Sequence, residues 1–268
     1  MRTENGNSNL DTGILYPDPE IDMTESQYLT IPALDKIGRV IHAFTTRQNG
    51  LGGRNNGIKL PDDWNAVAQS FGVDPDRLVT VNQVHGEHIV KVDDHNYRGI
   101  KRVQADAMIT DTPGIAIGVE TADCVPLLLV DPETPAVGAI HAGWRSTAKK
   151  IVEKTVKKMQ DKFCSNPSRM IAAIGPAIGP ECYEVDEPVM GPVREAFSFW
   201  RNVASPRGSN KWSLDLVRLN RMELIQAGLD EKSIHSIGMC TACRKDLFYS
   251  FRAEGRTGRM LSAIMIKP

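Results

Sequence analysis

Two histidines and one cysteine in this chain could together hold a metal ion. His85, Cys124 and His141 each lie at the end of a run of residues with strand character, where side chains can converge at the rim of a sheet. Zinc binds imidazole nitrogen and thiolate sulfur, and three protein ligands with an open fourth position are typical of catalytic zinc. Such an ion would keep the thiol deprotonated and lower the pKa of a bound water molecule.

The spacing of these three residues also fits a simpler interpretation. None of the intervals is a local metal signature such as His-Glu-x-x-His, so a buried, hydrogen-bonded histidine and an inert thiol remain an alternative. The chain has six histidines, and His42 and His88 are the best replacements if one of the three ligands is wrong.

The residues after His141 suggest that an anion binds near the metal. Alanine, glycine and tryptophan separate His141 from Arg145, and the amphipathic run 146–163 follows. A helix start offers unpaired N–H groups to an anion, and Arg145 either assists as a bidentate donor or is simply solvated. Arg47, at the end of a strand-like run, is a second candidate anion ligand, with an ordinary exposed arginine as the alternative.

The remaining cysteines give weaker signals. Cys240 and Cys243 have the C-x-x-C spacing of redox motifs and zinc half-sites, but no second C-x-x-C completes a four-thiolate site. Cys182 is expected to be a core thiol and Cys164 to be incidental. A cysteine hydrolase, with Cys124 as the nucleophile and a histidine as the base, is a further reading of the same residues.

Composition excludes several classes of protein. With 41% hydrophobic and 24% charged residues among 268, the chain is not globally disordered. A net charge of −1 gives no basic excess for replacing phosphate counterions, so nucleic acid is not an expected partner. No apolar run approaches the roughly 18 residues of a membrane span. Five cysteines and a polar N-terminus predict a reducing compartment, the cytoplasm, and the oligomeric state stays open.

The ligand candidates lie in a strand-rich part of the chain, and a helical period appears later. The glycine between the runs 78–82 and 88–92 suggests a hairpin or a bulge. Ser213 is expected to cap a helix over 214–227 that Gly228 ends. The other expected strands are 40–46, 107–110, 115–119, 126–130, 136–140, 169–174 and 260–267, and the other expected helices are 146–163 and one that begins near Pro188.

Several of these strands are apolar throughout rather than alternating. A strand covered on both faces has this composition, so helices or a second sheet should lie above and below it. Residues 1–24 have no sustained apolar period and are expected to form a flexible N-terminal extension. We therefore predict a single domain over residues 25–268 with an α+β fold, in which mixed β-sheets pack with helices on the outside.

A set of short stretches in a fixed order carries a family resemblance from about residue 30 to the C-terminus. The stretches are 42–47 (HAFTTR), 82–86 (NQVHG), 105–110 (ADAMIT), 121–126 (TADCVP), 139–145 (AIHAGWR), 174–180 (IGPAIGP), 182–185 (CYEV), 240–241 (CT), 248–252 (FYSFR) and 257–259 (TGR). Together they resemble the bacterial laccase-domain family. That family is also described as multicopper polyphenol oxidase-like and peptidoglycan editing factor-like, and more recently as purine nucleoside phosphorylase with adenosine deaminase side activity.

The resemblance implies an α+β fold with mixed sheets between helices. It also implies that His85, Cys124 and His141 are zinc ligands and that Arg47 faces the substrate or phosphate. The chain departs from the family pattern after Arg47, where residues 48–53 replace the usual Gly-Gly-Val-Ser tract and the customary Leu-Asn-Leu tract is absent. Because this loop is expected to line the mouth of the pocket, the departure bears on the choice of substrate.

The activity implied is zinc-dependent phosphorolysis of adenosine, inosine, guanosine or methylthioadenosine to the base and a sugar 1-phosphate, with adenosine deamination as a side activity. Arg47 and the helix start at Arg145 would hold phosphate. For deamination Asp123 and Glu120 are the nearest carboxylates, although Asp123 could face away from the metal and act structurally. The rival readings are a copper-dependent polyphenol oxidase, a peptidoglycan-precursor editing hydrolase with Cys124 as nucleophile, and a non-enzymatic zinc protein.

Overall fold

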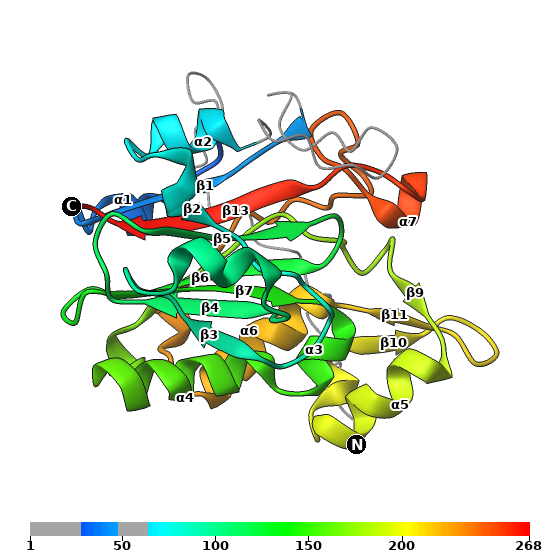
Figure 1. Ribbon diagram of the computed structural model, residues 1–268. Helices are drawn as coiled ribbons and strands as arrows, with labels where there is room; N and C mark the ends of the chain where they lie inside the picture. The colour runs from blue at the N-terminus through cyan, green and yellow to red at the C-terminus, as the bar shows by residue number, and fades with distance from the viewer. Residues whose placement is uncertain (1–27, 48–63) are drawn as a thin grey trace, which may run out of the picture.

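The structure is a computed structural model that describes residues 28–47 and 64–268. The expected extension over 1–24 and the divergent loop after Arg47 lie outside the described residues. The described chain forms two stacked β-sheets with helices on their outer faces (Figure 1). Each of these sheets combines parallel and antiparallel strand pairs, so the predicted α+β fold with mixed sheets is confirmed.

The two sheets differ in size and topology. One has four strands in the order β1-β13-β5-β2, and the other has six in the order β12-β8-β6-β7-β4-β3. The strands of the four-stranded sheet are β1 (Val40–Phe44), β13 (Met260–Ile266), β5 (Ala116–Thr121) and β2 (Leu78–Val79). Those of the six-stranded sheet are β12 (Ile234–Ser236), β8 (Ile171–Ile174), β6 (Val125–Asp131), β7 (Ala136–Ala142), β4 (Ala107–Thr110) and β3 (Ile89–Lys91).

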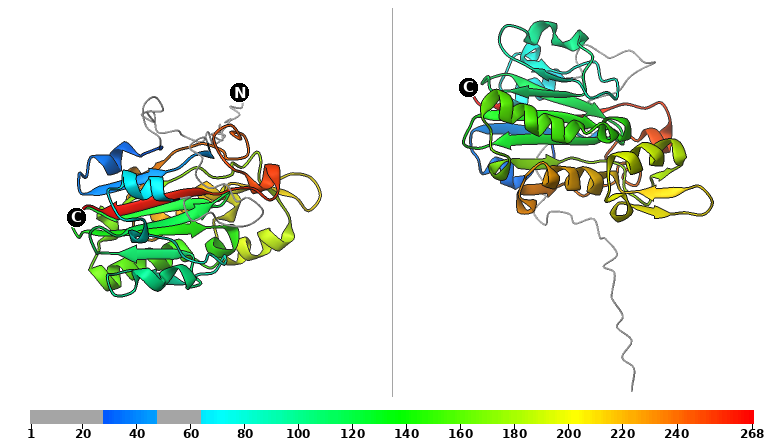
Figure 2. Two further views of the ribbon diagram at one scale, coloured as in Figure 1. Left: turned by 45° about the horizontal axis from the view of Figure 1, so that its top comes forward. Right: turned by 90° about the horizontal axis from the view of Figure 1, so that it is seen from below.

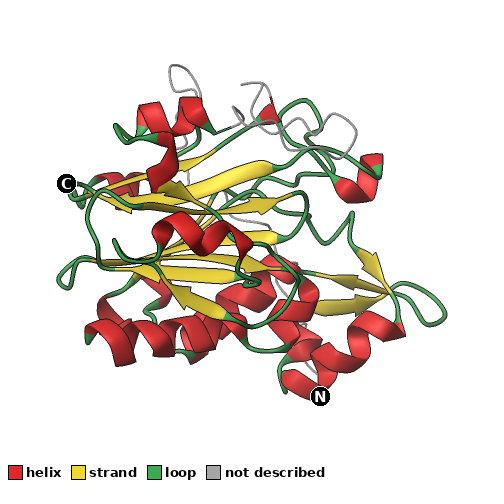
Figure 3. Cartoon of the chain, viewed as in Figure 1, coloured by secondary structure: helices red, strands yellow, loops and turns green. Residues whose placement is uncertain are grey.

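The central strands of the six-stranded sheet are buried on both faces, as their apolar composition predicts. Side chains of β6 alternate between two cores, because successive residues of a strand point to opposite faces. Leu127 and Leu129 pack into the core beneath the helices, whereas Leu128 and Val130 pack into the core between the sheets. Figure 3 shows the result, with strands in the centre and helices outside.

Helices cover the outer face of each sheet. The helices α4 (Ile151–Phe163) and α6 (Leu216–Gln226) lie across the six-stranded sheet, as the view from below in Figure 2 shows. Helix α2 (Asn65–Ser70) packs against the four-stranded sheet through Val67 and Ala68. The sheets therefore lie in the middle of the molecule, and the loops at their ends are left to form a site.

The helix expected over 146–163 is two helices. Lys150 separates α3 (Trp144–Ala148) from α4, and its φ of 63° is left-handed, so a right-handed helix cannot continue through it. The Lys150 ammonium lies 3.7 Å from the centre of the Phe197 ring. Because of this break, α3 packs against α5 (Glu187–Ala196) while α4 packs against β7.

Two local expectations are wrong. The runs around Gly86 form no hairpin, because β2 pairs with β5 in one sheet and β3 pairs with β4 in the other. Ser213 does not cap α6, because it lies in a strand and its hydroxyl donates to the Pro180 carbonyl. The cap is Asp215, whose side chain accepts a hydrogen bond from the Arg218 N–H at 2.8 Å.

A small three-stranded sheet, in the order β10-β11-β9, extends the molecule beside α5 (Figure 1). Within residues 28–47 and 64–268, every helix is too short or too polar to cross a membrane. The remaining elements are α1 (Pro32–Asp35), η2 (Pro75–Arg77), η3 (Tyr97–Arg102), η4 (Pro167–Arg169), β9 (Glu184–Val185), η5 (Trp200–Asn202), β10 (Ala204–Pro206), β11 (Trp212–Leu214), η6 (Glu231–Ser233) and α7 (Phe251–Glu254).

Candidate metal centre

The three predicted metal ligands come together where chain segments cross between the two sheets. His85 lies on the loop from β2 to β3, and Cys124 lies on the turn from β5 to β6, so both segments pass from the four-stranded to the six-stranded sheet. His141 lies in β7, next to β6, just before α3 (Figure 1). One donor atom of each residue lies within 4.8 Å of the others, and the Cys124 Sγ is 3.8 Å from the His85 Nε2.

The backbone around these residues is held in unusual conformations. His85 and Asp123 both have left-handed backbones, with φ of 58° and 90°, which costs roughly 1–3 kcal/mol for each residue. Gly143 allows the close approach of the ligands, because a Cβ there would lie 2.9 Å from the His85 Cδ2 and 3.0 Å from the Cys124 Sγ. The chain therefore accepts local strain and a glycine in order to close this cluster.

Asp106 is the residue that organises the cluster, and sequence reasoning did not single it out. Its buried carboxylate lies 2.7 Å from the His141 Nδ1 and accepts the backbone N–H groups of His85 at 3.0 Å and Gly86 at 2.6 Å. A carboxylate on one ring nitrogen fixes the tautomer of a histidine and leaves the other nitrogen to face a metal. Its sequence signal is a single acidic residue immediately before the apolar strand β4.

The charges in the cluster favour an ionised thiol. Burial alone raises the pKa of Cys124, but the His141 and His85 imidazoles outweigh this effect and lower it to about 6. Burial opposes the charged form of His141, yet the Cys124 thiolate and the Asp106 carboxylate raise its pKa to about 9. Without metal, the pair is therefore a thiolate beside an imidazolium, and a cation that displaces the imidazolium proton would meet a formed thiolate.

This donor set fits a metal. Two imidazoles and one thiolate suit zinc, and they also suit copper, because both metals accept nitrogen and sulfur ligands. The predicted metal-binding group is present in the structure, and its ligands do not themselves decide between zinc and copper. His42 and His88, the reserve ligands, lie elsewhere: the His42 Nε2 accepts the Ile31 N–H, and the His88 Nδ1 lies 2.9 Å from the Gln104 carbonyl.

Tyr183, which interacts electrostatically with Cys124, and Arg252, whose backbone N–H donates to Asp123, were not singled out from the sequence. Burial raises the pKa of Tyr183 above its usual range; Cys124 and Asp123 raise it further, while Arg252 and Arg145 oppose them. The phenol therefore lies within electrostatic range of the thiolate and of two cations. The Arg252 guanidinium carbon is 5.2 Å from the centre of the Tyr183 ring. A phenol that keeps its proton can donate a hydrogen bond to a bound anion.

The two predicted anion ligands have different surroundings. Arg145 is exposed at the start of α3, with its guanidinium carbon 4.3 Å from the centre of the Trp144 ring. Arg47 forms an ion pair with Glu254 at 2.9 Å and donates to the Lys245 carbonyl at 2.7 Å, so part of its hydrogen-bonding capacity is already used. Arg47 therefore ties β1 to the segment before and within α7.

The carboxylates considered for proton transfer accept hydrogen bonds from residues outside the three metal ligands. Asp123 accepts hydrogen bonds from the Thr241 hydroxyl at 2.7 Å and the Arg252 N–H at 2.6 Å, which is the structural role considered for it. Glu120 accepts a hydrogen bond from the Trp64 indole N–H at 3.3 Å.

Cys182 is not a core thiol, because it is half-buried and its Sγ lies 3.3 Å from that of Cys243.

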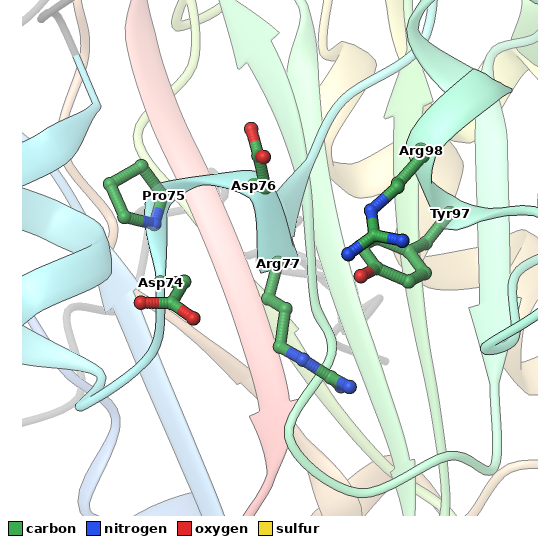
Figure 4. Close-up of a pocket in the computed structure, with 6 residues that line it drawn as sticks. All are labelled: Asp74, Pro75, Asp76, Arg77, Tyr97 and Arg98. Carbon is green, nitrogen blue, oxygen red and sulfur yellow. The ribbon is translucent and has the colours of Figure 1, made fainter.

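A hollow of about 600 Å³ lies in another part of the molecule (Figure 4). It is lined by residues of η2 and η3, and the guanidinium carbons of Arg77 and Arg98 lie 5.3 and 5.1 Å from the centre of the Tyr97 ring. None of the three metal-group residues lines this hollow. The metal group is therefore distinguished by its convergent donor atoms rather than by the size of a cavity.

Known proteins resemble the chain over most of its length. The family model described as multi-copper polyphenol oxidoreductase laccase matches residues 41–267. Purine nucleoside phosphorylase YlmD of Bacillus subtilis (strain 168) is 34% identical over 247 residues, which cover 85% of this chain and 89% of the relative. An adenosine deaminase from an unknown prokaryotic organism is 31% identical over 249 residues, which cover 85% of this chain and 94% of the relative.

A solved structure has the same fold. The crystal structure of the Bacillus licheniformis hypothetical protein YfiH matches with a TM-score of 0.83 and 31% identity, over 91% of this chain and 98% of that chain. These matches confirm the resemblance carried by the motifs, and the chain belongs to the multi-copper polyphenol oxidoreductase laccase family.

Proposed function

We propose that this chain is a zinc-dependent purine nucleoside phosphorylase with adenosine deaminase side activity. The observation that carries the proposal is the convergence of His85, Cys124 and His141 within 4.8 Å, beside a phenol and two arginines. Relatives named purine nucleoside phosphorylase and adenosine deaminase match at least 84% of the chain in the pairs compared, which supports the same reaction classes here. The proposed substrates are adenosine, inosine, guanosine or methylthioadenosine, with phosphate.

Cleavage of a glycosidic bond develops positive charge on the sugar, so an anionic nucleophile must be held close to it. Arg145 and Arg252 both act electrostatically on the Tyr183 phenol, and we assign them the phosphate, with Arg47 as the other predicted anion ligand. The protonated phenol of Tyr183 donates to the same anion. A zinc ion held by the three ligands supplies Lewis acidity and lowers the pKa of water.

The chain's own residues keep this site in order. Asp106 fixes the His141 ring and the backbone of the His85 loop, so both segments hold their positions before substrate arrives. Asp123 anchors the Arg252 backbone through a 2.6 Å hydrogen bond, which fixes the start of α7 beside the site.

The test is turnover of adenosine and inosine by the purified protein, with and without phosphate, followed by detection of free base and sugar 1-phosphate. Cys124→Ala, His85→Ala and His141→Ala should each lower turnover by at least about 100-fold, a common loss for a group that stabilises a transition state. Cys164→Ala removes an exposed thiol at the end of α4 and is the matched control. Unchanged turnover in Cys124→Ala would exclude the zinc mechanism.

A second function is favoured by one observation. The Cys124 thiol has a pKa lowered to about 6, after burial is outweighed by the two imidazoles, and a thiolate beside histidine is the arrangement of cysteine nucleophiles. A peptidoglycan-precursor hydrolase built on it would work in the presence of a chelator and be inactivated by alkylation of Cys124. Phosphorolysis that stops in chelator and returns with zinc would exclude this alternative.

The cytoplasm is the proposed location, and the odd number of cysteines, which suits a reducing compartment, supports it. The metal could also be copper, as the description of the family suggests. Metal analysis of protein purified without added metal distinguishes the two, and we expect zinc. Oxidation of a phenol with copper bound at this site would contradict the assignment.

A further inference from the structure

Three other cysteines meet on the surface next to the candidate metal centre. Cys182 lies on the turn before β9, whereas Cys240 and Cys243 lie on the segment that follows β12. The three Sγ atoms lie within 4.8 Å of one another, and those of Cys182 and Cys243 are 3.3 Å apart. We propose that these three thiols form a second metal site, which takes a thiophilic divalent cation such as zinc.

The spacing of the sulfurs suits a shared ion. Zinc–sulfur bonds of about 2.3 Å in a tetrahedron place sulfurs about 3.8 Å apart, whereas a disulfide needs about 2.05 Å. The observed 3.3 Å between the Cys182 and Cys243 sulfurs is well beyond a disulfide bond, and the 4.8 Å within which all three sulfurs lie includes the spacing expected around zinc. Cys240 and Cys243 supply two ligands as a C-x-x-C half-site, and Cys182, which is remote in sequence, supplies the third.

Backbone hydrogen bonds hold the two segments in place. Ala177 and Cys240 form a parallel bridge, and the Thr241 N–H donates to the Ala177 carbonyl at 3.0 Å. The Gly179 N–H donates to the Cys240 Sγ at 3.1 Å, a contact that favours the thiolate a metal requires. The Cys182 N–H donates to the Gly179 carbonyl at 3.1 Å, which turns this cysteine toward the other two.

The surroundings allow an ion to enter and to complete its coordination. Cys243 is exposed, while Cys182 and Cys240 are half-buried. The Glu181 carboxylate lies beside the cluster, since its Oε2 and the Cys240 Sγ both lie within 3.4 Å of the position that a Gly179 Cβ would occupy. Three thiolates with this carboxylate or a water in the fourth position make a site of the structural type.

The second ion would fasten a segment that supports the first site. Thr241, between the cysteines of the C-x-x-C pair, donates to Asp123, and Asp123 precedes Cys124. An ion bound to Cys182, Cys240 and Cys243 therefore links the turn before β9 to the segment that holds the Cys124 turn. This role concerns stability and does not depend on which reaction the first site performs.

The test counts metal ions in purified protein by mass spectrometry of the elements. We expect two zinc equivalents per chain in the wild type and one in Cys182→Ser or Cys243→Ser. Cys164→Ser, which removes an exposed thiol elsewhere, should keep both equivalents. Cys124→Ser should lose the other equivalent, so a failure of one site is distinguished from a failure of the other.

Two further measurements guard against variants that misfold. Cys243→His keeps a zinc ligand and should retain the second equivalent, whereas Cys243→Ser should lose it. In protein loaded with cobalt, the charge-transfer absorption of thiolate ligands should fall by more than half in Cys182→Ser, because three of the four ligating thiols belong to the second site. Equal metal content and equal spectra in Cys182→Ser and Cys164→Ser would overturn the proposal, as would a Cys182–Cys243 disulfide in the purified wild type.

Discussion

At the scale of single residues, the candidate metal centre depends as much on Asp106 as on its three ligands. One carboxylate holds the His141 ring and the backbone of the His85 loop, so it joins two segments that are distant in sequence. Replacing the Asp106 carboxylate with an amide of the same shape separates the effect of its charge and hydrogen bonds from the effect of its packing.

Asp106→Asn is expected to lower metal affinity by about 10- to 100-fold, the usual loss when a residue that orients a ligating histidine is changed. The affinity is measured by competition with a chromogenic chelator. Asp94→Asn, which removes an exposed carboxylate paired with Arg77, is the matched control and should have no effect. Equal affinities in the two variants would show that Asp106 does not orient the ligands.

A substitution at Gly143 tests whether the His85 and Cys124 side chains lie as close to this backbone position as described. Gly143→Ala places a methyl group 2.9 Å from the His85 Cδ2 and 3.0 Å from the Cys124 Sγ, so at least one ligand must move. We expect metal content to fall well below that of the wild type in the purified variant. Gly99→Ala meets no atom within 4 Å and serves as the control. Full metal content in Gly143→Ala would contradict the packing described here.

The three ligand candidates could be predicted from residue type and their place at strand ends, but their neighbours could not. Asp106, Tyr183 and Arg252 are ordinary residues in the sequence, and they matter because the chain brings separate segments together. Arg47, which the resemblance implies faces phosphate, forms an ion pair with Glu254 and stays a predicted ligand of the anion.

At the scale of elements, one buried carboxylate should make stability depend on pH. Glu223 lies inside the α4–α6 contact, where it accepts the Glu153 N–H at 3.0 Å. Burial raises its pKa from 4.5 to about 7, despite the opposing effects of that hydrogen bond and of Lys150. Because the native state holds this proton more tightly than the unfolded state, the contribution of Glu223 to stability is largest below about pH 4.5 and is lost as pH rises through about 7.

Glu223→Gln removes this titration. The free energy of unfolding of the variant, minus that of the wild type, should rise by about 3 kcal/mol between about pH 4.5 and pH 8. Urea unfolding at several pH values measures it. Glu195→Gln, on an exposed position of α5, should show no comparable rise. A pH-independent difference for Glu223→Gln would mean that Glu223 stays ionised in the folded protein.

The bounds of a strand could be predicted from the sequence where its apolar composition alone determines them. β4, β6, β7 and β13 lie close to their expected bounds because buried strands require apolar runs. The expected hairpin and the uninterrupted helix were wrong because strand pairing and the left-handed Lys150 depend on tertiary contacts. Asp215 rather than Ser213 caps α6, since β11 takes up Ser213.

At the scale of the whole molecule, the site lies where two chain crossings between stacked sheets meet the end of β7. Each sheet is stabilised by its own packed faces, which leaves the crossings free to carry strained residues such as His85 and Asp123. Apolar strands predict coverage on both faces, but they do not predict which strands are neighbours. The convergence of His85, Cys124 and His141 follows from the order of the strands in the two sheets, so only a three-dimensional structure could test it.

The central claim is that these three side chains bind one metal ion, and the most direct measurement is anomalous diffraction at the zinc edge from crystals of the purified protein. We expect a peak between the His85 Nε2, the Cys124 Sγ and the ring nitrogen of His141 that faces away from Asp106. The peak should disappear in Cys124→Ser crystals and remain in Cys164→Ser crystals. Absence of any peak between the three donor atoms in crystals grown with zinc would contradict the account.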